Sequence, residues 1–442
     1  MASTFKFHSQ VNETVPWQAQ YTFPTQATRV NKQIVKLPPK NGSQFTAGNI
    51  IRIEFPADNY LNVLNSVLAF DMTPTFAVST LNLPRHGAHS LIKRLRILYG
   101  SLVLEDIQEY STLVRIFTDL GVQPEYMSSV GAILDGMGST TNGVNLATAT
   151  PRSYCLNLLS GLLTCKKLIP LKWMAAQFAI EITLNSGAEA FVAAGTTTGG
   201  TFTVDNVNFI AEMLEFDSTY DTAFYAGLVQ GGVPLKFSSW HYHTTNVTNA
   251  ITSAQIHERS RSVKAGFAVV RQNNTSIAAD ANIFFNSLSA AAASNGFVTG
   301  SATGALTEFQ WRVGGRYYPS QPVSLTKGAA EALVEAMKTI NSLGDYRMAS
   351  KLSPTAWGGI DETTGAQLGA ATDLVICSEF ENTDVMPDAI AGINAEEQSD
   401  INLTIKAAAG PSGAQGGFKL DIFMHYDCLL IVRDGNVVDL VM

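Results

Sequence analysis

Residues 87–114, "GAHSLIKRLRILYGSLVLEDIQEYSTLV", decide the fold because they join two strand-like runs to a helix. In 91–100 and 102–107 apolar residues alternate with polar ones, and a Gly-Ser pair separates the two runs. Such alternation is typical of strands that bury one face. The stretch raises a question about organisation: why does a chain rich in short strands have one well-formed helix at this point?

The helix after these strands has one apolar face, formed by residues at three- and four-residue spacing: Ile107, Tyr110, Leu113, Phe117 and Leu120. We expect Asp106 to cap its first turn and Gly121 to end it. A helix this short is expected to pack on the edge of a β-sandwich. We interpret the whole unit as one half of a duplicated structure.

Similar runs continue along the chain in two sets with the same layout of strands, helix, long loop and further strands. In the first set we expect further strands at 49–56, 64–72, 153–163, 177–184 and 207–216, and loops rich in small residues at 122–150 and 185–202. In the second set we expect strands at 234–247, 263–272, 307–315, 316–323, 373–380, 400–406, 418–426, 429–434 and 437–442, a helix at 325–343 and a loop at 286–306.

The predicted fold class is all-β with a few short helices. Helices do not separate every pair of strands, so a parallel α/β sheet is disfavoured. Many short, half-buried strands over roughly 180 residues per half favour two antiparallel β-sandwiches of jelly-roll type in tandem. We divide the 442-residue chain into an extended N-terminal arm (1–48), a first jelly roll (49–217), a linker (218–233) and a second jelly roll (234–442).

The N-terminal arm combines prolines with aromatic residues that are costly to leave exposed to water: Phe5, Phe7, Trp17, Tyr21 and Phe23. We predict that these five residues take part in self-association, and docking on the arm's own domain or on a neighbouring subunit both stay open. Residues 1–40 carry a net charge of +4, from five Lys and Arg residues and one Glu. An ordinary solvated arm and a weak contact with nucleic acid or membrane are both compatible with this charge.

Composition points to an assembled protein that does not bind nucleic acid strongly. Charged residues make up 15% of the chain, against roughly 25% in soluble domains, so much of the surface is expected to be covered. The net charge of −8 disfavours a protein that neutralises many phosphates. Four cysteines without metal-ligand spacing are expected to be buried reduced thiols, which suits assembly in the cytosol or nucleus. No signal-peptide pattern and no apolar run of 18 residues is found.

Three motifs resemble binding sites but lack an essential part. "GAILDGMGST" (131–140) has the glycines of a phosphate-binding loop without the Lys-Ser/Thr that should follow, so we expect a flexible loop. His241 and His243 lie on one face of a predicted strand without an identifiable third ligand, so we expect packing residues. "RSRSVK" (259–264) is expected to be a strand entrance or an inter-subunit salt-bridge site. We therefore predict no metal and no cofactor.

Catalysis is also disfavoured. Glu105 with Asp106, and Glu379 with Glu381, are pairs of acidic residues, but glycoside hydrolysis needs two carboxyl groups about 5–10 Å apart across a cleft. We expect these residues to be solvated charges. No G-x-S-x-G motif of a serine hydrolase occurs in the chain. We predict that the protein is not an enzyme and has no catalytic residues.

Four stretches together resemble major capsid proteins of the double jelly-roll type: "GAHSLIKRLRILYGSLVLEDIQEYSTL", "SGLLTCKKLIPLKWMAAQFAIEITL", "ERSRSVKAGFAVVR" and "QWRVGGRYYPSQPV". The resemblance is nearest to the capsid proteins of Polinton-like viruses and virophages, in a lineage that includes adenovirus hexon. It covers about 49–434 and rests on the order and spacing of the strands.

The resemblance implies a major capsid protein that assembles as a homotrimer, with six jelly rolls forming a pseudo-hexagonal capsomer of an icosahedral viral shell. The implied partners are further copies of the chain, neighbouring capsomers, and penton and minor or cement capsid proteins. The implied location is the virion, after assembly in the host cytoplasm or nucleus. A contact of the N-terminal arm with an internal membrane stays open.

Two other classes of protein remain as alternatives. A viral spike or lectin-like protein with two sandwiches would bind a receptor or glycan through a concave aromatic or metal-lined site. A β-sandwich glycosidase would need two facing carboxylates, and mutation of either one would abolish turnover. A glycan-binding screen separates the first alternative from a capsid protein.

Overall fold

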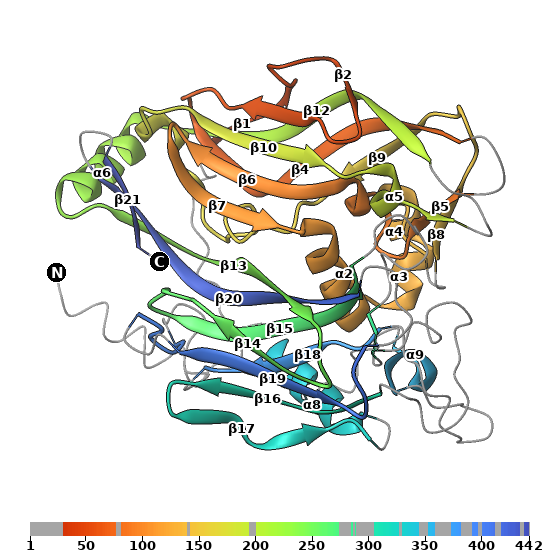
Figure 1. Ribbon diagram of the computed structural model, residues 1–442. Coiled ribbons are helices and arrows are strands. Elements are labelled where there is room, and N and C mark those ends of the chain that lie inside the picture. Colours follow the sequence, from red (N-terminus) through yellow and green to blue (C-terminus); the bar gives the residue numbers. More distant parts are fainter. Residues whose placement is uncertain are drawn as a thin grey trace, which may run out of the picture.

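The computed structural model describes residues 30–441 apart from 77–80, 139–141, 194–199, 274–283, 286–287, 289–304, 327–328, 344–351, 359–372, 382–390, 397–399, 412–416 and 434–436. Two β-sandwiches lie side by side, and the strands of both run across the view in Figure 1. The N-terminal half of the chain builds the upper sandwich and the C-terminal half builds the lower one. The described strands pair in an antiparallel manner within both.

The first sandwich has two sheets. One contains, in spatial order, β1 (Val30–Leu37), β12 (Thr201–Phe216), β4 (Tyr60–Thr75) and β9 (Arg152–Leu156), with β2 (Gln44–Thr46) also paired to β12. The other contains β3 (Ile50–Glu54), β10 (Phe178–Leu184), β6 (Ile92–Tyr99) and β7 (Leu102–Gln108).

The second sandwich repeats this plan. One sheet contains β13 (Val233–Val247), β20 (Phe418–Arg433), β15 (Val263–Gln272) and β18 (Ile376–Glu379), with β21 (Val437–Val441) also paired to β20. The other contains β14 (Ile251–Ile256), β19 (Ile401–Ala407), β16 (Leu306–Val313) and β17 (Arg316–Ser324).

The two sandwiches have the same topology. When the eight main strands of each are counted in chain order, the sheets of both read 1-8-3-6 and 2-7-4-5. This order defines a jelly roll, so the structure confirms the predicted fold class of two jelly rolls in tandem. In each sandwich a helix follows the fifth strand: α2 (Tyr110–Gly121) follows β7, and α8 (Ala330–Thr339) follows β17.

The residue before each of these two helices has the same backbone conformation. Glu109 precedes α2 with φ 49°, and Ala329 precedes α8 with φ 53°, so both lie in the left-handed region that non-glycine residues rarely adopt. The structure corrects the predicted start of the first helix. Ile107 and Asp106 belong to β7, and the carboxylate of Asp106 pairs with Arg94 instead of capping the helix. The predicted end at Gly121 is confirmed.

Alternation of side chains places the core between the sheets of each sandwich. The buried residues in and just after β3 are Ile51, Ile53 and Phe55. Arg52 and Glu54, which alternate with them, face outward. The ring of Phe55 meets Phe209 of the opposite sheet edge-to-face, with 5.2 Å between centroids, which ties the two layers together.

Short helices and strands occupy parts of two stretches that the sequence predicts as loops, 122–150 and 185–202. The elements are α3 (Pro124–Ser128), α4 (Val130–Leu134), α5 (Gly187–Ala190), β8 (Asn142–Leu146) and β11 (Val192–Ala193). The last two pair with β5 (Leu81–Pro84) in a small sheet. The remaining short elements are the 3₁₀ helices η2 (Gly87–Leu91) and η3 (Leu171–Trp173) and the helices α6 (Ser218–Val229) and α9 (Pro354–Gly358).

Regular elements also occupy parts of the segments that the sequence reading assigns to the arm and the linker. β1 and β2 lie within 1–48, and α6 lies within 218–233. The strand β14 was not predicted. β1 and β14 leave many side chains exposed, and an edge strand of this kind carries a weak hydrophobic pattern.

The longest strand of the second sandwich was predicted as two strands, 418–426 and 429–434, but β20 is continuous. The acidic residue at the expected break, Asp427, is buried inside the strand. It accepts hydrogen bonds from Ser238 Oγ at 2.8 Å and Ser262 Oγ at 3.1 Å. These donors satisfy the carboxylate, so the strand continues through it.

Three of the four cysteines are placed as the sequence predicts. Cys165, Cys377 and Cys428 are buried free thiols as predicted, whereas Cys155 is only half-buried. Among the described helices, none has the length and apolar composition needed to cross a bilayer.

We predict that Gly266→Ala destabilises the second sandwich. A Cβ at this position in β15 would lie 2.6 Å from Cη2 of Trp311, whose fully buried ring is held edge-to-face by Phe380. Overpacking of this kind costs about 1–3 kcal/mol in the free energy of unfolding. Chemical denaturation measures the loss. The matched control Gly315→Ala, where nothing lies within 4 Å of the new Cβ, should leave stability nearly unchanged. Equal stabilities would contradict the packing described.

Candidate site at the junction of the two sandwiches

The helix α2 lies between the sandwiches and contacts both (Figure 1). The ring of Phe117 packs on Trp240 and Phe267 of the second sandwich, with 5.7 and 5.4 Å between centroids. On the other side Leu113 and Ile116 are fully buried. The expectation that this helix packs on the edge of one sandwich is therefore wrong: the helix is an internal part of the junction.

A buried network of four charged residues crosses the junction beside α2. Arg115 of α2 contacts Asp119 at 3.2 Å and Asp373 of the second half at 2.7 Å. Arg85, just after β5, contacts the same two carboxylates at 2.7 and 2.8 Å. Two positive and two negative charges balance, and the exposed fraction of all four side chains is 6% or less.

Burial and charge act in opposite directions on this network. Burial lowers the pKa of Arg85, but the carboxylates of Asp119 and Asp373 outweigh this and hold it above its ordinary value. For Asp119 burial acts the other way and raises the pKa, and the negative charge of the neighbouring Asp373 raises it further. The guanidinium of Arg115 lies 4.3 Å from the ring centroid of Phe284, a further contact with the second half. Removing any one charge would leave an uncompensated charge in the interior.

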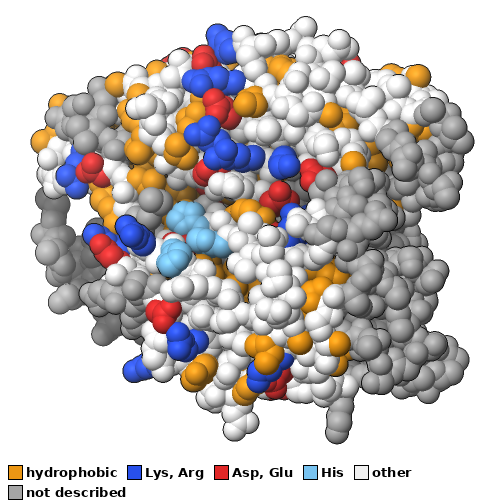
Figure 2. Space-filling view, in the orientation of Figure 1, with side chains coloured by type: hydrophobic (Ala, Val, Ile, Leu, Met, Phe, Trp, Pro, Cys, Tyr) orange, Lys and Arg blue, Asp and Glu red, His pale blue; other side chains and the backbone are white. Residues whose placement is uncertain are grey.

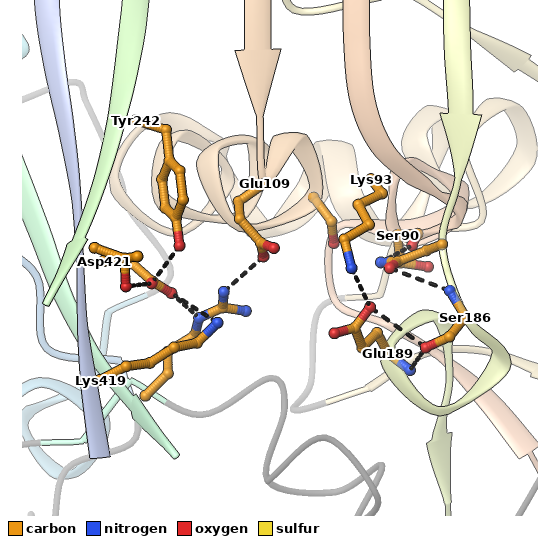
Figure 3. Close-up of polar contacts among 12 residues, drawn as sticks. Ser90, Lys93, Glu109, Ser186, Glu189, Tyr242, Lys419 and Asp421 are labelled. Atoms are coloured by element: carbon orange, nitrogen blue, oxygen red, sulfur yellow. Dashed lines mark hydrogen bonds and ion pairs between the residues drawn. The ribbon is translucent and has the colours of Figure 1, made fainter. Parts of the chain in front are cut away.

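A second polar contact joins Glu109, the residue just before α2, to the second sandwich (Figure 3). Arg271 of β15 contacts Glu109 at 2.7 Å and Asp421 of β20 at 2.5 Å. Tyr242 donates a hydrogen bond to Asp421 at 2.7 Å, and Lys419 lies 3.7 Å from it. Burial raises the pKa of Asp421, but Arg271 and Lys419 outweigh it and hold the pKa below its ordinary value. The left-handed backbone at Glu109 places its carboxylate on this side of the helix.

The same view shows how the other side of α2 is supported within the first sandwich (Figure 3). Lys93 lies 3.5 Å from the carboxylate of Glu189 in α5, and Ser186 Oγ donates to Glu189 at 3.3 Å. Ser90 of η2 donates a hydrogen bond of 2.7 Å to the carbonyl of Ala190. The hydrogen bond of Ser90 joins η2 to α5, and η2 packs directly on α2.

A third contact lies where β7 faces β13. Glu105 of β7 is fully buried and accepts hydrogen bonds from Ser160 Oγ, from the Gly161 amide at 2.9 Å and from Ser239 Oγ of β13 at 2.7 Å. Burial raises the pKa of Glu105, and these hydrogen bonds partly offset the shift. A Cβ at residue 161 would lie 1.6 Å from the Ser238 carbonyl, so only glycine allows this approach of the two sandwiches.

The acidic pairs singled out by sequence do not form a cleft. Glu105 and Asp106 point to opposite faces of β7, one into the junction and one toward Arg94 on the surface. The expectation that Glu105 is a solvated charge is wrong, because the junction buries it. Glu379 lies in β18, and Glu381 forms an ion pair of 2.8 Å with Lys264.

The two histidines of β13 contact one buried carboxylate. His241 Nδ1 lies 3.0 Å and His243 Nε2 3.5 Å from Glu258, and the ring of His241 stacks on Tyr426. Burial raises the pKa of Glu258, but its contacts with the two histidines outweigh this effect, so the pKa is well below its ordinary value. No group of three metal-ligating side chains suited to a metal ion is found among the described residues.

Figure 2 shows histidine side chains grouped near the middle of the surface in view. Among the described residues, a hollow of about 470 Å³ is lined by Gln255, His257, Glu258, Arg259 and Asp400, all of them polar. The described lining thus offers no aromatic platform of the kind that the lectin-like alternative needs. The basic stretch 259–264 leads into β15, which confirms the predicted strand entrance.

One outer face of the first sandwich carries paired charges. Arg52 contacts Glu181 at 2.9 Å, Arg96 contacts the same carboxylate at 3.2 Å, and Arg94 contacts Asp106 at 2.5 Å across neighbouring strands. Figure 2 shows Lys and Arg side chains next to Asp and Glu over this sandwich. Paired surface charges of this kind contribute little to stability. This face is therefore charged instead of apolar.

Exposed apolar side chains gather instead at the ends of the sandwiches. On the short helices α3 and α4, Ile133 has an exposed fraction of 73%, and Tyr126, Val130 and Leu134 are also exposed. The helix α4 includes residues 131–134 of the glycine-rich stretch 131–140, so the first part of that stretch is helical instead of a flexible loop. The predicted self-association residues Phe5, Phe7, Trp17, Tyr21 and Phe23 lie outside the described residues.

No protein family matches the sequence, and no curated protein matches it. The fold does match solved structures over nearly the whole chain. The Faustovirus major capsid protein matches with a TM-score of 0.63 and 8% identity, covering 96% of this chain and 94% of that one. A quasi-atomic model of the PBCV-1 virus capsid matches with a TM-score of 0.62 and 11% identity, covering 95% and 98%. The mavirus major capsid protein matches with a TM-score of 0.54 and 9% identity, covering 97% and 95%. The chain therefore has the double jelly-roll fold of these capsid proteins.

We predict that Asp373→Asn strongly destabilises the protein. The substitution keeps the shape but removes one of the two described carboxylates that Arg85 and Arg115 share, and removing one partner of a buried ion pair costs about 3–5 kcal/mol. Urea denaturation measures the change. The control Asp400→Asn breaks an ion pair with Arg312 whose side chains are 46% and 39% exposed, and it should cost less than about 1 kcal/mol. Equal losses would show that the network does not hold the junction.

We predict a pH dependence that comes from Asp135, at the end of α4. Burial raises the pKa of Asp135 to about 7, so the folded state holds this proton at pH values where the unfolded chain has released it. Stability should therefore fall as the pH rises from about 4 to about 7, by on the order of 2–4 kcal/mol from this group. Asp135→Asn should remove that slope in denaturation curves measured across this range. The control Asp400→Asn should retain it, and an unchanged slope in Asp135→Asn would contradict the assignment.

Proposed function

We propose that this chain is a viral major capsid protein that assembles as a homotrimeric capsomer of an icosahedral shell. The observation that carries the proposal is the pair of topologically identical jelly rolls held together by a buried, charge-balanced junction. The likeness in fold to major capsid proteins, over nearly the full length of both chains, supports it. The proposed role is structural and involves no catalysis.

Symmetry explains how this architecture suits a shell. Three chains around a threefold axis present six sandwiches of the same topology, so the trimer approaches a hexagonal outline. Such a tile needs a fixed orientation between its two sandwiches, because a hinge would spoil the contacts between neighbouring tiles. The three buried polar contacts beside α2 and β7 supply that rigidity.

The exposed apolar groups at the ends of the sandwiches fit contacts between copies. Stable homo-oligomers of this kind bury on the order of 2,000–5,000 Å² in total. The exposed side chains of α3 and α4 are suited to such an interface, since burying them from water is favourable. The proposal extends to neighbouring capsomers and to penton and minor or cement capsid proteins as partners, to the virion as location, and to assembly in the host cytoplasm or nucleus.

Light scattering coupled to gel filtration tests the proposal on the purified chain at micromolar concentration. We expect a mass three times that of the 47.5 kDa chain, and three-lobed or hexagonal particles in negative-stain electron micrographs. A monomer at this concentration would count decisively against the capsomer. Specific binding in a glycan screen by a monomer would instead support the lectin-like alternative.

A further inference from the structure

The helix α6 connects the two sandwiches at one end of the molecule, near β21 (Figure 1). Its sequence, "STYDTAFYAGLV", has apolar residues on every side, although only Leu228 is buried. Tyr220, Tyr225 and Val229 have exposed fractions of 41%, 44% and 56%. A helix that is apolar all round is normally covered all round, so the outer side of α6 lacks a covering layer among the described residues.

Below α6 lies an inner layer of aromatic rings that fixes the helix. Phe224 meets Tyr60 edge-to-face at 5.5 Å, and Tyr225 stacks on Trp173 at 5.6 Å between centroids. Tyr220 stacks on Phe216 at 4.3 Å. These contacts hold one side of each tyrosine ring, and the exposed part of each ring is suited to pack against a second layer of aromatic residues.

The start of the described chain lies beside this surface. Val30, the first residue of β1, pairs with Phe216, and Asp217 next to it is the N-cap of α6. Residues 1–29 therefore join the described chain next to the N-terminal end of α6. They contain the five aromatic residues of the N-terminal arm, of which Tyr21 and Phe23 are nearest to β1.

Chain length allows these residues to reach the whole helix. Tyr21 and Phe23 are nine and seven residues before Val30, which gives a reach of about 23–30 Å at roughly 3.3 Å per residue. The helix α6 has 12 residues and is about 18 Å long at 1.5 Å per residue. A segment tethered this close has an effective concentration in the millimolar range, which favours docking within one chain over docking on another copy.

We propose that residues 1–29 cover the outer face of α6 of the same chain, with aromatic side chains packed against Tyr220, Tyr225 and Val229. The contact lies within one chain, so it stands whether or not the chain forms capsomers. It assigns an occupant to this surface and makes the arm part of the first sandwich instead of a free tail.

Hydrogen exchange of the full-length protein tests this contact. In a variant with Tyr21→Ser and Phe23→Ser, the backbone amides of α6 should exchange at least about tenfold faster than in the unchanged protein, because the covering layer is lost. The amides of α8 serve as the internal control and should not change. Equal exchange of α6 in both proteins would overturn the proposal.

Cross-linking separates docking within a chain from docking between chains. Cysteines are introduced as Phe23→Cys and Tyr225→Cys and joined with a flexible bismaleimide. The control pair is Phe23→Cys with Ile251→Cys, an exposed apolar position on β14. We expect an intrachain product that forms faster than in the control and migrates as a monomer in denaturing gels. A cross-linked dimer would assign the arm to a neighbouring copy and overturn the proposal, as would equal rates in both pairs.

Discussion

The architecture depends on the charge balance of four buried residues, Arg85, Arg115, Asp119 and Asp373. Each arginine faces both aspartates, so the described ion pairs are complete only when segments from both halves of the chain are present. A buried network of this kind adds little net stability compared with apolar packing, but breaking it is costly. It therefore favours the relative placement of the two sandwiches in which these ion pairs form. The helix α2, which begins within residues 87–114, contributes Arg115 and Asp119 to this network.

Much of the fold could be predicted because its central strands bury one face. Ile51, Ile53 and Phe55 alternate with outward residues, and Ile180 with Ile182 show the same period. The elements that sequence reasoning missed have a different physical basis. β1 lies at a sheet edge with most side chains exposed, and α6 has apolar residues on all sides, so neither shows a clear period. The start of α2 was misplaced because Ile107 continues the apolar spacing of the helix although it belongs to β7.

The candidate site was less accessible to sequence reasoning than the fold. One signal was present: Arg115 and Asp119 are the two charged residues of α2, four residues apart, and a buried charge is costly unless it is paired. Their partners Arg85 and Asp373 lie far away in the sequence, and no local pattern connects them. Glu105 was misjudged for the same reason, since its donor Ser239 belongs to the other half. Long-range polar contacts are set by tertiary structure, which a single sequence does not display.

The separation of 258 residues between Arg115 and Asp373 has a consequence for biosynthesis. A ribosome that adds about 5–20 residues per second needs roughly 13–50 s to progress from one to the other. During that interval Arg85 and Arg115 of the N-terminal jelly roll have Asp119 beside them but lack the carboxylate of Asp373. A translation product that ends before residue 373 therefore lacks the ion pairs of Asp373 as well as the apolar contacts of Phe117 with the second sandwich.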